Sequence, residues 1–157
     1  MSCDANVQKG KDLVLLARND ADTAYELVGG IKSLGYTIDN PVEDTTNAST
    51  PGDFLESEWT GYSQMTVTAS GMADKRTGVI DPATGLNVVG SVRLLQIANS
   101  SANNKCGQFK ILNVDTDGFI EGFFNMTSFG KTGDTPGLMN FDTTLQSKDT
   151  IIVSGDV

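Results

Sequence analysis

One short segment constrains the fold of this chain more than any other feature. In residues 63–70, Met65, Val67 and Ala69 alternate with polar side chains. Successive side chains of a β-strand point to opposite faces, so the apolar residues share one face and the polar residues share the other. The segment is therefore predicted to be a strand with one face in a hydrophobic core. Its other face is expected to meet water or a wet channel.

Further strand-like runs, separated by turn residues, occur along most of the chain. Residues 12–17 form the expected first strand. Residues 24–28 and 31–38 look like a hairpin pair joined through Gly29 and Gly30. Later strand candidates are residues 108–114, 119–129, 138–145 and 150–154. This succession predicts a mostly β fold, either a β-sandwich or a partial barrel.

One segment, residues 86–102, has the periodicity of a helix. Apolar residues recur there at spacings of three and four, at Val88, Val92 and Leu95. Asn87 is the expected N-cap, and the turn residues between Asn103 and Gly107 are the expected end. We therefore expect one α-helix flanking the β-structure, in a single domain that covers residues 1–157.

Composition excludes several classes of protein. The chain has 157 residues, with 38% hydrophobic and 20% charged residues, which is too apolar for a disordered chain. Its formal charge of −9 argues against nucleic-acid affinity, which needs Lys and Arg to neutralise phosphates. It has no His, which excludes Ser-His-Asp catalysis and His-ligated zinc. Cys3 and Cys106 form no CxxC pair, so idle thiols in a reducing compartment are expected, with one long-range disulfide as the alternative.

No targeting segment is expected from the sequence. The longest apolar runs, such as residues 13–17, are much shorter than the ~20 residues that a membrane span needs. The first residues contain an early acid and no apolar run of the kind that a signal peptide carries.

Residues 40–61 form a long polar insertion between two predicted strands, and its charge is one-sided. No Lys or Arg occurs between positions 33 and 73, whereas acids occur at Asp39, Glu43, Asp44, Asp53, Glu56 and Glu58. Phe54, Leu55 and Trp59 lie inside this acidic stretch. A loop of this length in a compact domain is usually functional or disordered. Its aromatic residues indicate either contact with a partner or packing back onto the chain's own domain.

Two apparent ligand motifs have simpler explanations. Residues 113–118 match the first half of a calcium loop, but the twelfth position, which needs a bidentate Glu, holds Phe124. A hairpin turn with Gly118 at positive φ explains the same residues. Residues 128–133 contain SxxK and KTG, but the two motifs share Lys131 and cannot fill both roles of a penicillin-recognising site. Paired carboxylates suit glycoside hydrolysis, yet nothing selects one pair among 20 acids. We therefore expect no catalytic residue, no metal site and no cofactor.

The order of these elements resembles one known family, the major tail proteins, which are tail tube subunits of long-tailed bacteriophages and gene transfer agents. Residues 9–16 are similar to the family's first strand. Residues 27–39 and 43–47 are similar to its second hairpin and the Asp-Thr-containing loop beyond. Trp59, Gly61 and residues 65–71 follow in the expected order, as do residues 118–124 and 140–145. The resemblance covers nearly the whole chain as a pattern of strands and turns.

The resemblance implies a structural virion protein. Such subunits form hexameric rings whose strands join into one continuous barrel around a channel, with helices outside, and the rings stack into the conduit for genome delivery. The implied partners are other copies of the chain, a tape measure protein, a tail terminator and tail tip proteins. DNA would pass through the lumen without specific binding. The implied location is the virion tail, with the host cytoplasm as the site of assembly.

The same resemblance suggests where copies touch. We expect the insertion at 40–61 to contact another subunit or ring. The expected contact residues are Asp44, Thr46, Asn47, Phe54, Leu55 and Trp59. The N-terminal segment through Lys11 and the tail from Asp149 are expected to become ordered only on assembly.

Two other classes of protein remain open at this stage. A tube protein of a contractile injection or secretion system would share the architecture. A β-sandwich module that binds carbohydrate would be a monomer with exposed aromatic platforms, which fits poorly with 7% aromatic residues and a single Trp.

Overall fold

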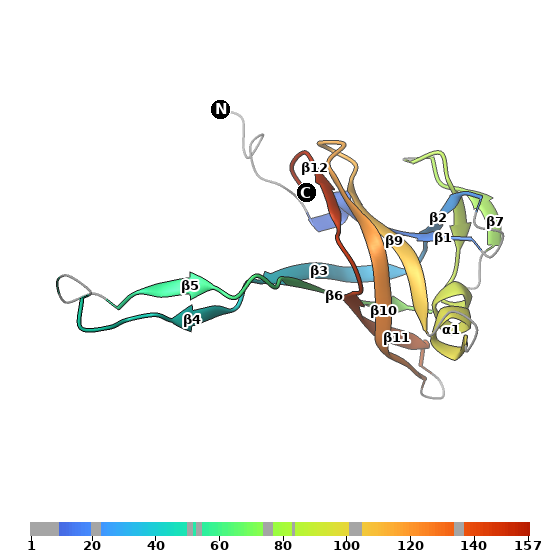
Figure 1. Ribbon diagram of the computed structural model, residues 1–157. Coiled ribbons are helices and arrows are strands. Elements are labelled where there is room, and N and C mark those ends of the chain that lie inside the picture. The colour runs from blue at the N-terminus through green and yellow to red at the C-terminus, as the bar shows by residue number, and fades with distance from the viewer. Residues whose placement is uncertain are drawn as a thin grey trace, which may run out of the picture.

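A computed structural model describes residues 10–19, 23–49, 52, 55–73, 77–82, 84–100, 105–133 and 137–157 of this chain. Nearly all of its regular structure is β (Figure 1). The elements are η1 (Gly10–Asp12), β1 (Leu13–Arg18), β2 (Tyr25–Val28), β3 (Ile31–Asp39), β4 (Val42–Asp44), β5 (Ser57–Trp59), β6 (Gln64–Met72), β7 (Thr77–Ile80), β8 (Asn87–Val89), α1 (Val92–Asn99), β9 (Cys106–Asn113), β10 (Phe119–Thr132), β11 (Asn140–Ser147) and β12 (Ile152–Ser154).

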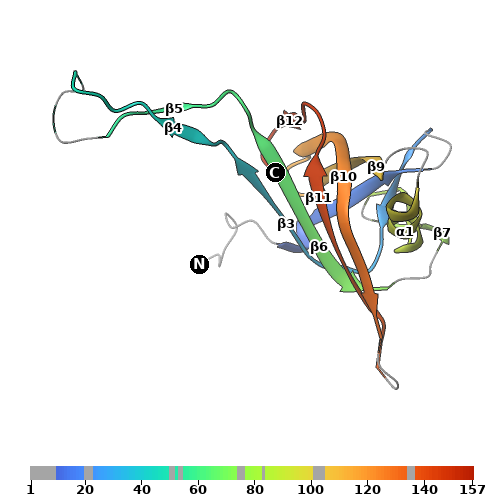
Figure 2. The same cartoon turned by 60° about the horizontal axis from the view of Figure 1, so that its bottom comes forward.

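Ten of the strands form one curled sheet with the order β3-β6-β11-β10-β9-β1-β2-β8-β7, and β12 pairs with β10 beside that path. Strands β3, β6, β11 and β10 make one panel, and β9, β1 and β2 cross behind it (Figures 1 and 2). Among the described residues no ladder joins β3 to β7, so the sheet stays open in the single chain. The mostly β fold with one flanking helix, expected from the sequence, is confirmed.

The hydrophobic core lies in the space that the curled sheet and α1 enclose. Phe109 and Phe124 are 0% and 1% exposed and meet edge to face, with ring centroids 6.2 Å apart. Leu94 and Ile97 of α1 are also buried there. The helix can approach closely because Gly107 of β9 has no side chain, since a Cβ there would lie 2.9 Å from Cδ1 of Ile97. Burying each large side chain of this kind contributes about 1.5–3 kcal/mol.

The alternating segment is a strand as predicted. Met65, Val67 and Ala69 of β6 are 1%, 1% and 3% exposed, and the residues between them point to the other face. The predicted strands at 12–17, 108–114, 119–129, 138–145 and 150–154 all occur, with bounds shifted by a few residues.

The helix predicted at 86–102 is wrong in its first part. Residues 87–89 form β8, which pairs with β2 and β7, and α1 begins only at Val92 with Ser91 as its N-cap. The β-branched Val88 and Val89 favour a strand, and two ladders outweigh the helical periodicity. Asn87 is therefore a strand residue. The helix also ends earlier than predicted, at Asn99 with Ser100 as its C-cap. Asn103 and Asn104 lie outside the described residues, and Gly107 belongs to β9.

The hairpin predicted for residues 24–38 is also wrong. Both strands exist, but β2 pairs with β1 and β8, whereas β3 pairs with β6. The chain crosses between the two parts of the sheet at Gly29 and Gly30, where Gly30 has a φ of 81°. There the Gly29 N–H donates to Val89 O and the Gly30 carbonyl accepts from Met72 N–H. Long-range ladders thus compete successfully with the local turn.

The C-terminal segment is ordered in the single chain, contrary to the expectation that it awaits assembly. Strand β12 pairs with the start of β10, and the Tyr36 hydroxyl donates a 2.7 Å hydrogen bond to Val157 O. Gly118 leaves room for the Asp156 backbone, because a Cβ at Gly118 would collide with it. Residues 113–118 form the β9–β10 turn as predicted, but Asp117 (φ 58°) takes the positive φ, not Gly118. The N-terminal residues 1–9 lie outside the described residues.

Candidate assembly surfaces

One face of the panel formed by β3, β6, β11 and the end of β10 is polar. Strand pairing aligns its outward residues in rows: Ser33, Ser70 and Asp142; Gly35, Thr68 and Thr144; Thr37, Thr66 and Gln146. Gly130 of β10 extends the first row and Ser128 extends the second. We call these rows the polar panel, and their residues include neither Lys nor Arg. Its reverse side carries Val67, Leu145 and the rest of the core.

The two margins of the panel expose strand edges. Strand β3 pairs only with β6, which leaves its other edge without a ladder among the described residues. On β10, β9 pairs only as far as Asn125, so Thr127–Thr132 has β11 on one side and no described strand on the other. A free edge presents unpaired N–H and C=O groups to any strand that can pair with them. The panel therefore has a pairing surface at each side.

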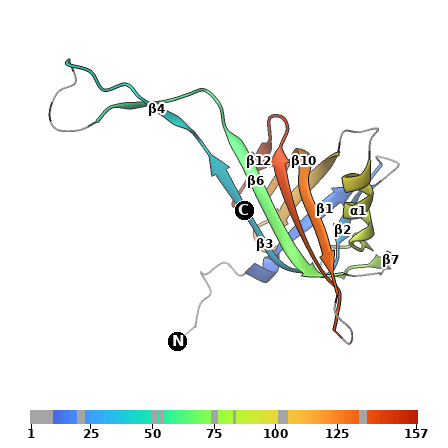
Figure 3. The same cartoon turned by 90° about the horizontal axis from the view of Figure 1, so that it is seen from below.

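The insertion at 40–61 is a β-ribbon and not the irregular loop that the sequence suggested. Its strands β4 and β5 pair antiparallel and project away from the sheet (Figures 1 and 3). We call this ribbon the arm. Val42 lies opposite Trp59, and these side chains are 61% and 57% exposed. Glu43 lies opposite Glu58 on the other face, so like charges oppose each other across the ribbon.

The expected contact residues near the end of the arm mainly bond to the arm itself. Asp44 Oδ1 accepts a 2.9 Å hydrogen bond from the Thr46 N–H, and hydrogen bonds from the side chain and backbone of Thr46 lower the pKa of Asp44. Thr46 Oγ1 accepts from the Glu56 N–H at 2.7 Å and lies 3.2 Å from Glu56 O. Asn47 Oδ1 accepts from the Ser49 N–H at 2.8 Å. These side chains therefore shape the arm's turn.

The apolar residues of the arm are open to solvent. Leu55 is 80% exposed, so the structure shows no packing of this side chain onto the chain's own domain. Phe54, the third expected apolar contact, lies outside the described residues.

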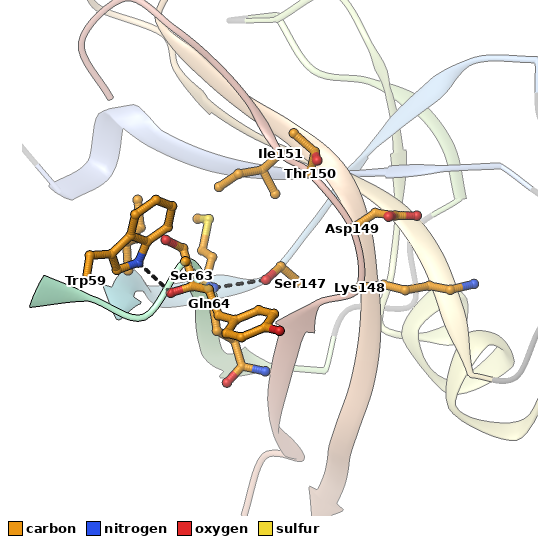
Figure 4. Close-up of a pocket in the computed structure, with 12 residues that line it drawn as sticks. Trp59, Ser63, Gln64, Ser147, Lys148, Asp149, Thr150 and Ile151 are labelled. Carbon is orange, nitrogen blue, oxygen red and sulfur yellow. Dashed lines mark hydrogen bonds between the residues drawn. The ribbon is translucent and has the colours of Figure 1, made fainter. Parts of the chain in front are cut away.

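Sequence reasoning missed a hollow of about 460 Å³ at the base of the arm (Figure 4). Ile38, Trp59 and Ile151 contribute apolar surface to it. The Trp59 indole N–H donates to Tyr62 O at 2.7 Å, and the Met65 N–H donates to Ser147 Oγ at 2.9 Å. We call it the arm-root hollow. It combines segments that are far apart in the sequence, so no local pattern indicated it.

The described part of the chain has neither a cluster of metal-ligating side chains nor a helix that could span a membrane. No group of three or more His, Cys, Asp or Glu side chains there is arranged to hold a metal ion. No helix within the described ranges is long and apolar enough to cross a membrane.

Comparison with solved structures identifies the fold. A chain from the tail of an empty gene transfer agent particle, determined with C6 symmetry, matches with a TM-score of 0.74 and 17% identity, covering 94% of this chain and 99% of that one. A chain from the native gene transfer agent virion matches with a TM-score of 0.69 and 18% identity over the same shares. The SPP1 tail tube matches with a TM-score of 0.65 and 15% identity, covering 96% of this chain and 81% of that one. No protein-family model and no curated protein matches the sequence.

Proposed function

We propose that this chain is a tail tube subunit of a bacteriophage or gene transfer agent, a structural protein that assembles into stacked hexameric rings around a channel for the genome. The main observation that supports this proposal is the panel with one polar face and two free edges, within a fold shared with subunits of solved tails. The C6 symmetry of the gene transfer agent tail supports a ring of six. The same likeness favours this function over a carbohydrate-binding module or a contractile injection tube.

The free edge of β3 in one copy can pair with the free edge of β10 in the next copy. Strands β3, β6, β11 and β10 alternate in direction, so β3 and β10 run antiparallel to each other. In a ring with all copies in one orientation, β3 of one copy therefore meets the β10 edge of its neighbour as an antiparallel pair. Pairing residues 127–132 with β3 continues the sheet around the ring and removes both open edges.

The polar panel supplies a suitable channel lining. The opposite face packs against the core, so only this face is free to point inward. Its hydroxyl and amide groups, with Asp142 and no cations in the rows, offer duplex DNA no release of counterions. The genome would therefore slide through without specific binding. The chain acts in this proposal without catalysis or a cofactor.

The arm is proposed to contact an adjacent ring or subunit. Leu55 and Trp59, with Phe54 as predicted from the sequence, supply apolar anchors. Asp44, Thr46 and Asn47 would contribute by holding the turn in shape. In the virion tail the tube would also meet a tape measure protein, a tail terminator and tail tip proteins, and it would be assembled in the host cytoplasm.

Electron microscopy of the concentrated purified protein tests the proposal. Negative-stain images should show hollow tubes, and averaged end views should show sixfold symmetry. A protein that stays monomeric at high concentration and also fails to add to purified tail tubes would contradict the proposed function.

Cysteine pairs test the ring seam directly. In a background with Cys3→Ser and Cys106→Ser, Thr37→Cys combined with Ser128→Cys or Thr132→Cys places both thiols on the polar face. Because register must keep the polar faces together, an intermolecular disulfide is expected only between positions on the polar face, and its formation by either pair in assembled rings would locate the seam. Lys131→Cys is the matched control, since its side chain alternates to the other face and should not cross-link to Thr37→Cys.

A further inference from the structure

The panel has two different ends, which strand register defines without reference to any partner. One end contains Asp39, paired with Gln64, and leads into the arm. The other end contains Asn140, paired with Met72 and Thr132, and leads into the β10–β11 connection. Figures 2 and 3 show the arm and this connection at opposite ends of the molecule. When identical rings stack head to tail, the second end of one copy meets the first end of another.

The β10–β11 end presents apolar side chains. Leu138 is 70% exposed and Met139 is 50% exposed. The base of this connection is anchored, because the Ala73 N–H donates a 2.9 Å hydrogen bond to Met139 O. We call the described residues Gly133 and 137–139 the tip. An apolar side chain held on an anchored connection is well placed to insert into a partner.

The arm end presents a cavity for such a side chain. The arm-root hollow measures about 460 Å³, which lies within the range of about 300–1,000 Å³ of pockets that hold small ligands. Figure 4 shows Trp59 on one side and the segment from Ser147 to Ile151 on the other, with the Lys148 side chain pointing away. Apolar surface from Ile38, Trp59 and Ile151 is therefore left open to a partner's side chain.

The charges at the two ends are complementary. At the arm end the exposed charged residues include Asp39, Glu43, Glu58 and Asp149 against Lys148. Among the residues that the structure describes, those at the tip end are Lys32 and Lys131 against Asp142. The arm end is thus net negative and the tip end is net positive, and such complementarity favours one stacking orientation over its reverse.

We propose that Leu138 in the tip of one copy inserts into the arm-root hollow of a copy in the adjacent ring. This contact rests on the proposed tube function and adds to it a second joint between rings, separate from the outer part of the arm. It joins the panels themselves end to end, so that the channel wall continues across the ring boundary. Its occupant is a second copy of this chain, selected by matching apolar surface and opposite net charge.

Substitution of Leu138 tests the contact. Leu138→Asp should leave the fold intact, because the side chain is largely exposed, but should lower tube yield by about tenfold or more, since an unpaired carboxylate would be forced into an apolar hollow. Ile80→Asp is the matched control, because Ile80 is 64% exposed on β7, the last strand of the sheet order, and belongs to neither the tip nor the arm-root hollow. Circular dichroism and thermal melting verify the fold of each variant. Normal tube yield from Leu138→Asp would overturn the proposal.

A cysteine pair locates the contact. In the background with Cys3→Ser and Cys106→Ser, tubes carrying both Leu138→Cys and Tyr62→Cys should form disulfide-linked chains of many copies on oxidation. Tyr62→Cys keeps the backbone oxygen that accepts from the Trp59 indole, so the hollow should keep its shape. Each single variant should form no such chains. Intact tubes of the double variant without cross-links would contradict insertion at this site. An unsubstituted protein that stays monomeric and also fails to add to purified tail tubes would instead contradict the proposed function itself.

Discussion

The chain forms two antiparallel ribbons, one continuing into the other, and they differ in whether a hydrophobic core packs against them. In the inner ribbon β3 pairs with β6, and Val67 opposite Tyr36 is 1% exposed. In the outer ribbon β4 pairs with β5, and Val42 opposite Trp59 leaves both side chains more than half exposed. The backbone pairing is alike, but only the inner ribbon has a core of its own chain beneath it.

This difference predicts that the sheet determines the stability of the single chain and that the arm mainly affects assembly. A two-stranded ribbon without a hydrophobic partner is marginally stable in water. The inner ribbon and its sheet therefore account for folding of the single chain, whereas the arm, in the proposed function, would gain further stabilisation against another copy. Changes in the sheet should mainly affect unfolding, and changes in the arm should mainly affect tubes.

The largest effect on stability is expected in the central strand β11. Leu145 is 0% exposed, so Leu145→Ala should lower the free energy of unfolding by about 2–5 kcal/mol through lost burial and a residual cavity. Urea denaturation of the unassembled protein measures this change. Val42→Ala in the arm is the matched comparison and should change it by no more than about 0.5 kcal/mol. An equal loss of unfolding free energy in Leu145→Ala and Val42→Ala would contradict the prediction that the sheet, and not the arm, stabilises the single chain.

The arm should show the reverse pattern. Leu55→Asp should leave the unfolding free energy within about 0.5 kcal/mol, because its side chain is 80% exposed, while tube yield falls severalfold through loss of an apolar anchor. Pelleting and electron microscopy measure the yield. Leu95→Asp on α1, at a site 48% exposed, serves as the control and should assemble normally. Unchanged yield from Leu55→Asp would remove this residue from the proposed contact.

The two faces of the sheet should differ in access after assembly. With Cys3→Ser and Cys106→Ser as background, Thr68→Cys on the polar panel and Gln96→Cys on α1 should both react with a bulky polymer maleimide before assembly, because both sites are exposed. In tubes only Gln96→Cys should remain reactive, since the polymer cannot enter a narrow lumen. Equal labelling of the two variants in tubes would show that the polar panel does not face the channel.

The smallest expected effect concerns the arm's turn. Hydrogen bonds from Thr46 lower the pKa of Asp44 from its ordinary value of 3.8, so the folded turn favours the charged carboxylate. This stabilisation is present above pH 3.8 and is lost as the pH falls through the lowered pKa. Hydrogen exchange at the Thr46 amide should therefore accelerate in acid relative to the intrinsic rate. In Asp44→Ala protection should be weak at every pH, and a protection profile like that of the unsubstituted chain would contradict this role.

Local patterns predicted eight of the strands but missed β4, β5, β7 and β8, and they predicted strand partners poorly. The alternation at Met65, Val67 and Ala69 identified β6 because side-chain direction is a local property. Gly29 and Gly30 look like a hairpin turn in sequence, yet the chain crosses there to a different part of the sheet. Residues 87–89 likewise became a strand because ladders to distant segments were available. Pairing depends on the whole topology, which no single window of sequence contains.

The same limit applies to the surfaces. The one-sided charge and the apolar residues of 40–61 indicated either partner contact or packing onto the chain's own domain, and they did not show that the segment is a ribbon. The arm-root hollow joins Trp59 to residues 147–151, and the free edge of β10 exists because β9 ends its pairing at Asn125. Both features depend on where distant segments stop relative to each other, so sequence reasoning had no signal for them.

Each edge strand of the panel contains a β-bulge, in which one extra residue has no partner on the neighbouring strand. Lys32 is the extra residue in β3, and Thr127 is the extra residue in β10. Such bulges bend a strand and increase its local twist. Antiparallel pairing between copies is compatible with a ring of any number of subunits. The angle between neighbouring copies in the proposed ring would therefore depend on how strongly the edge strands bend. In the proposed ring these two bulges lie in the strands that would pair between neighbouring copies, so they would contribute to that angle and to the width of the channel.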